Sequence, residues 1–341
     1  MKKMETNKKI LITGASGFIG HALVQEMIDR GYETWAGVRA SSKTSDLERM
    51  GARIIVLTCE KKTRLNEELN VFKNTNGKWN YIIHAAGVTK CMDSRDFMKV
   101  NYVNTRNFIE ALLSNDMGPD KFVYLSSLSI FGALHEDSKT PISEADTPQP
   151  NTAYGRSKLR AEQYIRNIPD FPYIILRPTG VYGPREKDYY IMAKSIKQHV
   201  DFSVGYKPQC ITFIYVQDVV QAACLSIESN IVKREYFISD DKEYSSRNFS
   251  DLIQKEMNIK WVLHIKSPLF ILKIVSLCAE FLSSITGQPS TLNRDKYKIM
   301  KQRNWRCDIS PIKNELGYKP EYDLRSGVKQ TIEWYKKHQW L

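Results

Sequence analysis

The stretch KILITGASGFIG, residues 9–20, decides the fold of this chain. Its first five residues, Lys9–Thr13, form a short and mostly apolar run of the kind found in buried parallel strands. Three glycines follow, and Phe18–Arg30 then carries apolar residues at helical spacing until Gly31 offers a natural stop. A strand, a glycine-rich turn and an amphipathic helix in this order predict the first unit of a doubly wound fold.

The same alternation continues through the first two-thirds of the chain. Short apolar runs predict further strands at residues 34–39, 52–57, 79–84, 121–125 and 172–176. Longer amphipathic segments predict helices at residues 93–113 and 152–168. Right-handed crossovers join strands that alternate with helices into a parallel sheet. The predicted fold class is therefore α/β, with a doubly wound parallel sheet of the Rossmann type.

The pattern loosens after Pro178, where loops rich in Tyr, Pro and Gly begin. We therefore expect two unequal domains in this chain of 341 residues. Residues 1–178, together with about 210–240, are predicted to form the Rossmann domain. Residues 179–209 and 241–341 are predicted to form a smaller, discontinuous substrate domain.

The composition is that of a globular protein with a basic surface. Hydrophobic residues make up 42% of the chain, which excludes wholesale disorder. The 50 Lys and Arg outnumber the 38 Asp and Glu, but they are dispersed, and no nucleic-acid-binding motif accompanies them. Solvated lysines are the favoured interpretation and contact with an anionic lipid surface is the second; we expect no nucleic-acid partner.

The six cysteines are too scattered for a disulfide framework or a zinc site. They are Cys59, Cys91, Cys210, Cys224, Cys278 and Cys307. We interpret them as reduced thiols of a cytoplasmic protein and predict no bound metal. The basic N-terminus leads only into a short apolar run that Gly14 breaks early, so we expect no secretory signal.

The glycines between residues 14 and 20 predict a dinucleotide site. Their spacing lets the backbone turn tightly and brings the start of the following helix against a pyrophosphate. The predicted contacts are Gly14, Ser16, Gly17, Phe18, Ile19 and Gly20. The next predicted strand ends at Arg39, where NAD enzymes usually carry an acidic residue, and an Arg suits the 2′-phosphate of NADP. With Lys43 nearby, NADP is the expected cofactor and NAD the alternative.

A second set of residues carries acid–base chemistry. Tyr154 and Lys158 lie four residues apart in a predicted helix and therefore share one face. A phenol works as an acid or base near neutral pH only beside a cation, which Lys158 supplies. Ser127 follows a predicted strand at the sheet edge where ligands bind, so it can hydrogen-bond a substrate oxygen. The HAAG segment (84–87) closes another strand with small residues that allow a cofactor to approach closely.

Taken together, these motifs resemble the extended short-chain dehydrogenases/reductases, the NAD-dependent epimerase/dehydratase superfamily. The matching segments are TGASGFIG (13–20), HAAG (84–87), Asn101 before Thr105-Arg106-Asn107, SSLSIFG (126–132), YGRSK (154–158), LRPTGVYGP (176–184), FIYVQDV (213–219), LGYKP (316–320) and GVKQTIEWY (327–335). The resemblance implies that Tyr154 is the catalytic acid/base, that Lys158 lowers its pKa, and that Ser127 binds the substrate oxygen. Asn101 would kink its helix and support a water relay. Thr58 departs from the Asp that many relatives carry near the adenine, which weakens any contact there.

Further contacts follow from the same resemblance. Expected cofactor contacts beyond the glycine loop are Arg39, Ala85, Ala86, Gly87, Lys158, Pro178 and Val181. Expected substrate contacts are Thr89, Ser129 and Tyr182. Relatives often dimerise through two long helices that correspond to residues 93–113 and 152–168, so a homodimer through these segments is one outcome that the resemblance implies.

Two departures from nucleotide-sugar relatives favour an apolar substrate. Gly180 stands where such relatives often carry an Asn, and Ile211 where they tend to carry an Arg, both as diphosphate ligands. A buried diphosphate without these ligands would be poorly compensated, although other basic residues could substitute. Those candidates are Arg185, Lys187 and Lys194.

The leading hypothesis is an NADP-dependent oxidoreductase that transfers a hydride between nicotinamide and a small hydrophobic carbonyl or alcohol, such as a sterol, a lipid or a polycyclic compound. A nucleotide-sugar epimerase or dehydratase that uses tightly bound NAD is the alternative. A cofactor-binding regulator without catalysis is a third, which the complete set of Ser127, Tyr154 and Lys158 disfavours.

Residues 268–287 (PLFILKIVSLCAEFLSSITG) form a broadly apolar segment with one polar stripe. Two charges within it argue against a helix that spans a bilayer. Packing on the protein's own core is the favoured interpretation, and a lid over an apolar substrate or a peripheral membrane contact is the alternative. The layout is similar to hydroxysteroid dehydrogenases and dihydroflavonol-type reductases, so membrane association of a cytoplasmic protein stays open.

Overall fold

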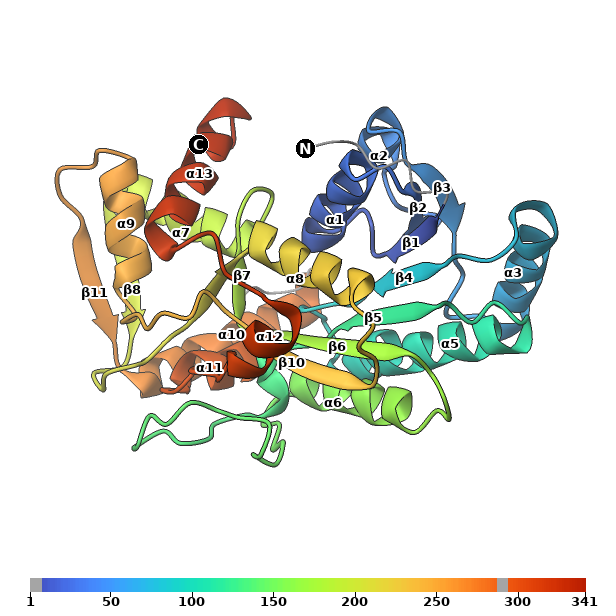
Figure 1. Cartoon of the computed structure of the whole chain (residues 1–341). Coiled ribbons are helices and arrows are strands. Elements are labelled where there is room, and N and C mark those ends of the chain that lie inside the picture. The colour runs from blue at the N-terminus through green and yellow to red at the C-terminus, as the bar shows by residue number, and fades with distance from the viewer. Residues whose placement is uncertain (1–7, 287–293) are drawn as a thin grey trace.

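The computed structural model describes residues 8–286 and 294–341 and has a parallel sheet at its centre (Figure 1). The sheet has the strand order β10-β6-β5-β4-β1-β2-β3, and all its pairings are parallel. Its strands are β1 (Lys9–Thr13), β2 (Glu33–Val38), β3 (Arg53–Val56), β4 (Tyr81–His84), β5 (Lys121–Leu125), β6 (Tyr173–Pro178) and β10 (Arg234–Ile238). This topology confirms the predicted doubly wound α/β fold, and the predicted strands agree with the observed ones to within two residues.

Helices cover both faces of this sheet, which explains why its strands are almost wholly apolar. On one face lie α1 (Phe18–Asp29) and α8 (Val216–Glu228). On the other lie α3 (Lys62–Asn76), α5 (Asn104–Ser114) and α6 (Ala153–Arg166). Strand β1 serves both layers, because Ile10 and Ile12 pack into the first and Leu11 into the second.

Within residues 8–178, the α-helices α2 (Ser45–Arg49) and α3 were not predicted from the sequence. Helix α3 has the sequence KTRLNEELNVFKNTN and buries only Leu65, Leu69 and Phe72. These three apolar residues do fall at helical spacing, but polar residues dominate the rest of the segment. The packing of this narrow stripe on the sheet stabilises the helix more than its composition suggests.

The predicted helix at 93–113 is interrupted. It consists of α4 (Ser94–Phe97), a π-helical turn η1 (Met98–Val103) and α5. Asn101, the expected kink residue, lies inside η1. A π-helical turn inserts an extra residue into a helix and is frequent at functional sites.

A second region lies beyond the carboxyl end of the sheet, because β7 (Gly180–Tyr182) begins two residues after β6 ends. Strand β7 pairs with β9 (Phe213–Tyr215), and β8 (Val200–Val204) pairs with β11 (Leu263–Ser267). The helices of this part are α7 (Lys187–Lys197), α9 (Asn248–Glu256), α10 (Leu269–Thr286), α11 (Arg294–Lys301) and α13 (Leu324–Lys337). Two short elements, η2 (Leu128–Ile130) and α12 (Ser310–Leu316), accompany β5 and β10.

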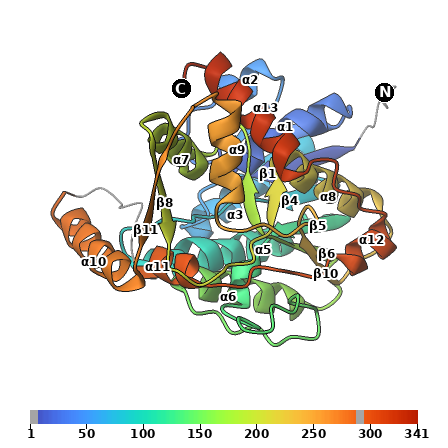
Figure 2. The same cartoon turned by 90° about the vertical axis from the view of Figure 1, so that its left-hand side faces the viewer.

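An aromatic cluster holds this second region together. Tyr182, Phe213 and Phe249 pack closely there, and Tyr182 and Phe249 meet edge to face with ring centroids 5.1 Å apart. Helix α13 closes the cluster from the other side through Val328 and Ile332. Figure 2 shows α7, α9 and α13 grouped together, while α10 extends away from them.

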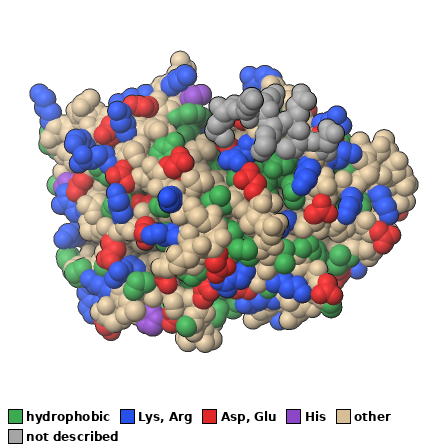
Figure 3. All heavy atoms as spheres, in the orientation of Figure 1, with side chains coloured by type: hydrophobic (Ala, Val, Ile, Leu, Met, Phe, Trp, Pro, Cys, Tyr) green, Lys and Arg blue, Asp and Glu red, His purple; other side chains and the backbone are tan. Residues whose placement is uncertain are grey.

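Charged side chains of both signs are spread over the face shown in Figure 3, with Asp and Glu between the Lys and Arg. Within residues 8–286 and 294–341, no helix has the length and apolarity needed to cross a bilayer. In the same ranges, no three His, Cys, Asp or Glu side chains gather in a way that could hold a metal ion.

Candidate active site

The glycine loop sits where β1 meets α1, and its geometry leaves the start of the helix open to an anion. Gly14 has a φ of +68°, and a Cβ atom there would lie 2.8 Å from the Ala85 carbonyl oxygen. A Cβ on Gly20 would lie 2.1 Å from the Gly14 carbonyl oxygen, so the helix can approach the loop only without a side chain there. Gly17 is the N-cap, no side chain caps α1, and its first turn has no acidic residue. These features fit the pyrophosphate of a dinucleotide.

The predicted cofactor contacts gather at the carboxyl ends of β1, β2 and β4. Ser16 and Gly17 are exposed, Phe18 and Ile19 half-buried. The Gly14 contact with the backbone of Ala85 and Ala86 brings the β4 end against the loop, and Gly87 follows, exposed.

Arg39 follows β2 and is exposed, beside the glycine loop. Its backbone N–H donates to the Ser42 hydroxyl at 3.2 Å, and the Ser16 hydroxyl donates to the same Ser42 oxygen at 3.4 Å. Ser42 thus connects the two loops and was not singled out from the sequence. The N–H and the hydroxyl of Thr58 both donate to Glu68, at 2.9 and 2.7 Å.

Helix α6 positions Tyr154 and Lys158 at its start. Thr152 caps the helix by accepting a hydrogen bond from the Gly155 N–H at 2.9 Å. The buried Lys158 ammonium donates to the Leu125 carbonyl at 2.7 Å and lies 4.7 Å from the centroid of the Tyr124 ring. Burial lowers the pKa of Lys158 to about 8.

Tyr154 has a different environment from the one that the resemblance implies. Burial raises the pKa of Tyr154, and a hydrogen bond with the Ser127 hydroxyl opposes that rise. The structure therefore brings Ser127 and Tyr154 together, but it does not show the lowering of the phenol pKa expected from Lys158. The reason is geometric, because the Lys158 ammonium is directed at the Leu125 carbonyl.

Asn101 connects the loop after β4 to α6. Its side-chain oxygen accepts from the Val88 N–H at 2.8 Å, and its amide donates to the Val88 carbonyl and to the Ser157 hydroxyl, each at 3.0 Å. A Cβ on Gly87 would lie 3.0 Å from the Asn101 side-chain oxygen and 3.4 Å from the Lys158 ammonium. Gly87, Asn101 and Lys158 are thus neighbours, whereas the water relay through Asn101 stays a prediction.

His84, the last residue of β4, is buried. Its two ring nitrogens hydrogen-bond the hydroxyls of Thr13 and Thr105 at 2.8 and 2.9 Å. Burial, with the nearby Lys158 charge, lowers the pKa of His84 to about 3. The ring is therefore neutral at physiological pH and supports the ends of β1 and β4.

The structure adds residues that sequence reasoning missed. Asp295 of α11 accepts hydrogen bonds from the N–H groups of Ala153 and Tyr154 at 2.7 and 3.2 Å.

The hydroxyls of Ser126 and Thr179, at the carboxyl ends of β5 and β6, are buried and find no hydrogen-bond partner within the described residues. Unpartnered hydroxyls at ligand-binding strand ends suit a bound molecule. For Ser126 the signal was available, since it directly follows the strand predicted at 121–125, whereas Thr179 follows the observed end of β6 and not the end predicted at residue 176.

The three predicted substrate contacts differ in their exposure. Thr89 is exposed and Ser129 half-buried, both after strands that reach the site. Tyr182, in contrast, is fully buried in the aromatic cluster, and its hydroxyl donates to the Asp323 carbonyl at 3.3 Å. We therefore assign Tyr182 to the core instead of the substrate. Pro178 is buried at the end of β6, and Val181 is half-buried in β7.

The two positions that bear on the substrate class face aromatic rings. A Cβ on Gly180 would lie 3.0 Å from the Tyr189 hydroxyl and 3.3 Å from the Phe213 ring. Ile211 pairs with Tyr244 through two backbone hydrogen bonds of 2.9 Å. Arg185, one basic candidate for a diphosphate, pairs with Asp46 of α2 at 3.1 Å. Neither Ile211 nor Arg185 therefore supplies a charged ligand for a diphosphate beside Gly180.

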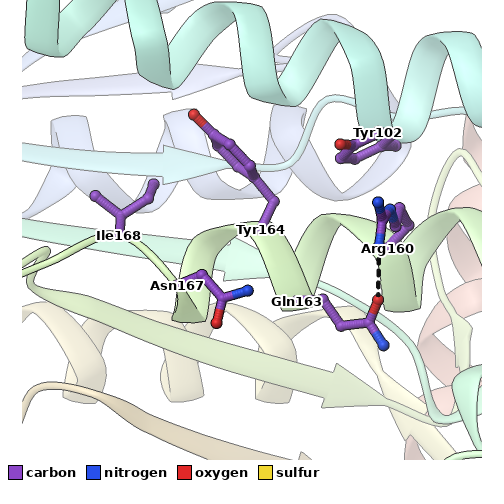
Figure 4. A pocket seen from close by; sticks show the side chains of 6 residues that line it. All are labelled: Tyr102, Arg160, Gln163, Tyr164, Asn167 and Ile168. Carbon is purple, nitrogen blue, oxygen red and sulfur yellow. Dashed lines mark hydrogen bonds between the residues drawn. The ribbon is translucent and has the colours of Figure 1, made fainter.

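A separate pocket lies on the outer side of α6 and η1 (Figure 4). It is lined by Tyr102, Arg160, Gln163, Tyr164, Asn167 and Ile168. Its volume of about 160 Å³ is too small for a dinucleotide, since ligand pockets usually exceed about 300 Å³. It lies on the two segments through which the resemblance implies a homodimer, and that dimer stays a prediction.

Comparison with known proteins agrees with this geometry. The model of the family described as "NAD dependent epimerase/dehydratase family" matches residues 10–238. A putative UDP-glucose 4-epimerase of Methanocaldococcus jannaschii is 25% identical over 96% of this chain and 99% of its own length. A decarboxylating sterol-4-alpha-carboxylate 3-dehydrogenase of Saccharomyces cerevisiae is 23% identical over 95% of this chain and 97% of its own.

Solved structures share the fold. The crystal structure of a UDP-glucose 4-epimerase from Thermotoga maritima with UDP-glucose superposes with a TM-score of 0.77. The match covers 97% of this chain and 99% of that one, at 21% sequence identity. The shared fold thus extends through both regions of the chain.

Proposed function

Because this chain belongs to the NAD-dependent epimerase/dehydratase family, we propose that it is an oxidoreductase that reduces a hydrophobic carbonyl compound to the alcohol with NADPH. Its relatives are NAD(P)-dependent epimerases, dehydratases and dehydrogenases, and the chain is an enzyme of the same extended short-chain type. The observation that carries the proposal is the placement of Tyr154 and Lys158 at the start of α6, where the Lys158 ammonium bonds the Leu125 carbonyl two residues before Ser127 and lies close to Gly87.

Each residue of the site has a role in such a reduction. The cofactor, when bound, supplies the hydride that reaches the carbonyl carbon. The Tyr154 phenol donates a proton to the carbonyl oxygen, and the Ser127 hydroxyl holds that oxygen by a hydrogen bond. The Lys158 ammonium contributes positive charge near Gly87, and the uncapped start of α1 holds the pyrophosphate.

The Tyr154 phenol is protonated at neutral pH, and burial, which raises its pKa, favours that form. In this form it can donate a proton to a carbonyl oxygen.

The surroundings of Gly180 and Ile211 support a hydrophobic substrate. Tyr189 and Phe213 fill the space beside Gly180, and Ile211 packs against the aromatic cluster. A diphosphate in such surroundings would lose its hydration without gaining charged hydrogen bonds. The sterol dehydrogenase among the relatives acts, by its name, on an apolar ring system.

The position of Arg39 supports NADP. Arg39 directly follows β2, its backbone is connected to the glycine loop through Ser42, and no acidic residue stands at this strand end. An Arg there suits a 2′-phosphate, with which it can form two parallel hydrogen bonds. NAD is the alternative cofactor, because the family description names NAD and NAD enzymes usually carry an acidic residue at the position of Arg39.

A nucleotide-sugar epimerase is the second candidate. It is favoured by the UDP-glucose 4-epimerases among the relatives and by the superposition on one of them. In that reaction NAD stays bound and is not consumed, and a charged group must hold the diphosphate. Lys187 and Lys194, both exposed on α7, are the remaining basic residues for this role.

Two measurements distinguish the candidates. The protein is incubated with NADPH and a panel of apolar ketones, and NADPH oxidation is followed by absorbance. Thermal unfolding is then measured with NADPH, NAD, UDP or dTDP, because a ligand that binds the folded state raises the midpoint. We expect NADPH oxidation and no effect of UDP or dTDP. Conversion of a UDP-sugar without net cofactor oxidation would overturn the proposal in favour of an epimerase.

A further inference from the structure

Most apolar side chains in the first half of helix α10, residues 269–277, are exposed. Phe270 is 65% exposed, and Ile271, Ile274, Val275 and Leu277 are exposed as well. On the opposite side Leu272 and Ser276 are buried. A helix on a protein surface normally shows the reverse arrangement, with its apolar stripe facing the core. This helix therefore has an unpartnered apolar face.

The strands before α10 extend this surface. In the β8–β11 pair, Ile265 lies opposite Phe202, and both are exposed, as is Leu263 two residues earlier on the same face. The other face of the pair is polar: buried Asp201 bonds His264 at 3.0 Å, His264 contacts Arg247 just before α9, and Lys266 is exposed on this face. The apolar residues of this two-stranded sheet thus also point outward.

The two parts are continuous. Helix α10 begins two residues after β11 ends, and the Leu269 side chain lies 3.7 Å from the Cβ position of Gly205, just after β8. Figure 2 shows α10 leaving the base of the β8–β11 pair and projecting from the molecule. We call the exposed side chains of β8, β11 and α10 the apolar rim; they are Phe202, Leu263, Ile265, Phe270, Ile271, Ile274, Val275 and Leu277.

Within residues 197–207 and 258–277 the exposed charged side chains are all lysines. Exposed lysines stand along residues 197–207 and 258–277, at Lys197, Lys207, Lys260, Lys266 and Lys273. The one acidic residue in these two stretches is Asp201, which is buried against His264. Exposed Tyr206 and Trp261 add aromatic rings with polar groups, a type that suits the boundary between lipid and water.

We propose that the apolar rim binds the surface of an anionic lipid bilayer. Phenylalanine and aliphatic side chains enter the headgroup region, while the lysines beside them contact lipid phosphates and carboxylates. The helix lies on the membrane without crossing it. This inference does not depend on the substrate class proposed above.

The composition favours a bilayer over a second copy of this chain. Protein–protein interfaces are depleted of lysine, whereas five exposed lysines stand along this surface. Two copies would also bring these like charges together, in a chain whose formal net charge is already +12. An anionic membrane neutralises them instead.

The test is co-sedimentation with phosphatidylcholine vesicles, with and without phosphatidylglycerol. We expect binding to the phosphatidylglycerol vesicles that decreases at high salt. The double variant Phe270→Ser/Ile274→Ser should weaken binding by about tenfold or more. Lys260→Glu/Lys273→Glu should weaken binding by at least about 25-fold, since each lysine near an anionic surface contributes about fivefold.

Two matched variants lie far from the apolar rim. Val71→Ser removes a 66% exposed apolar residue of α3, and Lys61→Glu reverses an exposed charge just before that helix. Both should bind vesicles as the wild type does. The proposal is overturned if the wild type does not sediment with anionic vesicles, or if the rim variants bind as it does. It is also overturned if the wild type is a dimer that Phe270→Ser/Ile274→Ser makes monomeric with unchanged vesicle binding.

Discussion

The Asp295 carboxylate accepts a hydrogen bond from the backbone N–H of Tyr154, 3.2 Å away, although 141 residues separate the two in the chain. The same oxygen accepts from the Ala153 N–H at 2.7 Å. Together with the Thr152 cap, Asp295 satisfies N–H groups that the first turn of α6 would otherwise leave unpaired. Its negative charge also interacts favourably with the positive end of the helix. Helix α11 therefore fixes the start of the helix that carries Tyr154.

Replacing this cap should destabilise the protein. Asp295→Ala is expected to lower the free energy of unfolding by about 1 kcal/mol, the usual value for a lost N-cap. Asp295→Asn keeps an acceptor oxygen and should lose less than half of that. Urea unfolding of the three proteins measures both effects. Equal stability of the wild type and Asp295→Ala would show that water replaces the carboxylate without cost.

Removing the phenol hydroxyl should abolish acid catalysis. Tyr154→Phe is expected to lower turnover by about 10²- to 10⁴-fold, because general acid catalysis contributes that much. Cofactor affinity, measured by titration calorimetry, should stay the same, since the hydroxyl contacts Ser127. Tyr164→Phe on the outer side of α6 is the matched control and should keep full activity. Turnover by Tyr154→Phe at the wild-type rate would remove Tyr154 from the mechanism.

The sheet and the candidate catalytic residues could be predicted from the sequence because both depend on local patterns. The run before Gly14 identifies β1, and the four-residue spacing of Tyr154 and Lys158 identifies a shared helix face. Such patterns need only neighbouring residues. The positions of Gly14 and Ala85 then follow from strand order, since β1 and β4 are adjacent in a doubly wound sheet.

The contacts that escaped prediction depend on residues far apart in the chain. No local pattern announces that Asp295 reaches α6. Tyr182 belongs to a motif shared with relatives, but its burial depends on Phe249 and on the carbonyl of Asp323. The apolar composition of α10 suggests a helix buried in the core, because apolar residues are usually buried. Only the exposure of Phe270 and its neighbours identifies it as a surface.

The buried His84 should make the protein sensitive to acid. Its pKa is about 3 in the folded protein, against 6.5 for an ordinary histidine, so below pH 6.5 the unfolded state binds a proton that the folded state does not. Stability therefore falls by about 1.4 kcal/mol per pH unit as pH decreases from 6.5 towards 3. His84→Asn can still bond Thr13 and Thr105 but lacks this titration.

Unfolding of both proteins at pH 7 and pH 5 measures the effect. The wild type should lose about 2 kcal/mol more than His84→Asn over this interval. The same loss in both proteins would mean that other groups cause the acid sensitivity.

A buried ion pair should respond strongly to the loss of one partner. Arg177 of β6 forms two hydrogen bonds with Glu162 of α6, at 2.7 and 3.2 Å, and a further ion pair with Glu235. Arg177→Met leaves the Glu162 carboxylate buried without its partner, so the free energy of unfolding should fall by about 3–5 kcal/mol. Adding Glu162→Gln to Arg177→Met removes the buried unpaired charge and should restore part of the lost free energy of unfolding. Arg64→Met breaks the exposed Arg64–Glu68 pair and should cost less than about 1 kcal/mol.

The cofactor preference should change with Arg39. Arg39→Asp removes the guanidinium and adds a carboxylate that repels a 2′-phosphate but accepts a hydrogen bond from a 2′-hydroxyl. The dissociation constant for NADPH should rise about 10- to 100-fold, as expected for the loss of hydrogen bonds to a charged group, while that for NADH stays the same or falls. Titration of each dinucleotide by fluorescence provides both constants. Arg49→Asp changes an exposed Arg of the neighbouring α2 by the same charge and should leave both constants within about twofold of the wild type. Equal weakening of NADPH and NADH by Arg39→Asp would show that Arg39 does not recognise the 2′-phosphate.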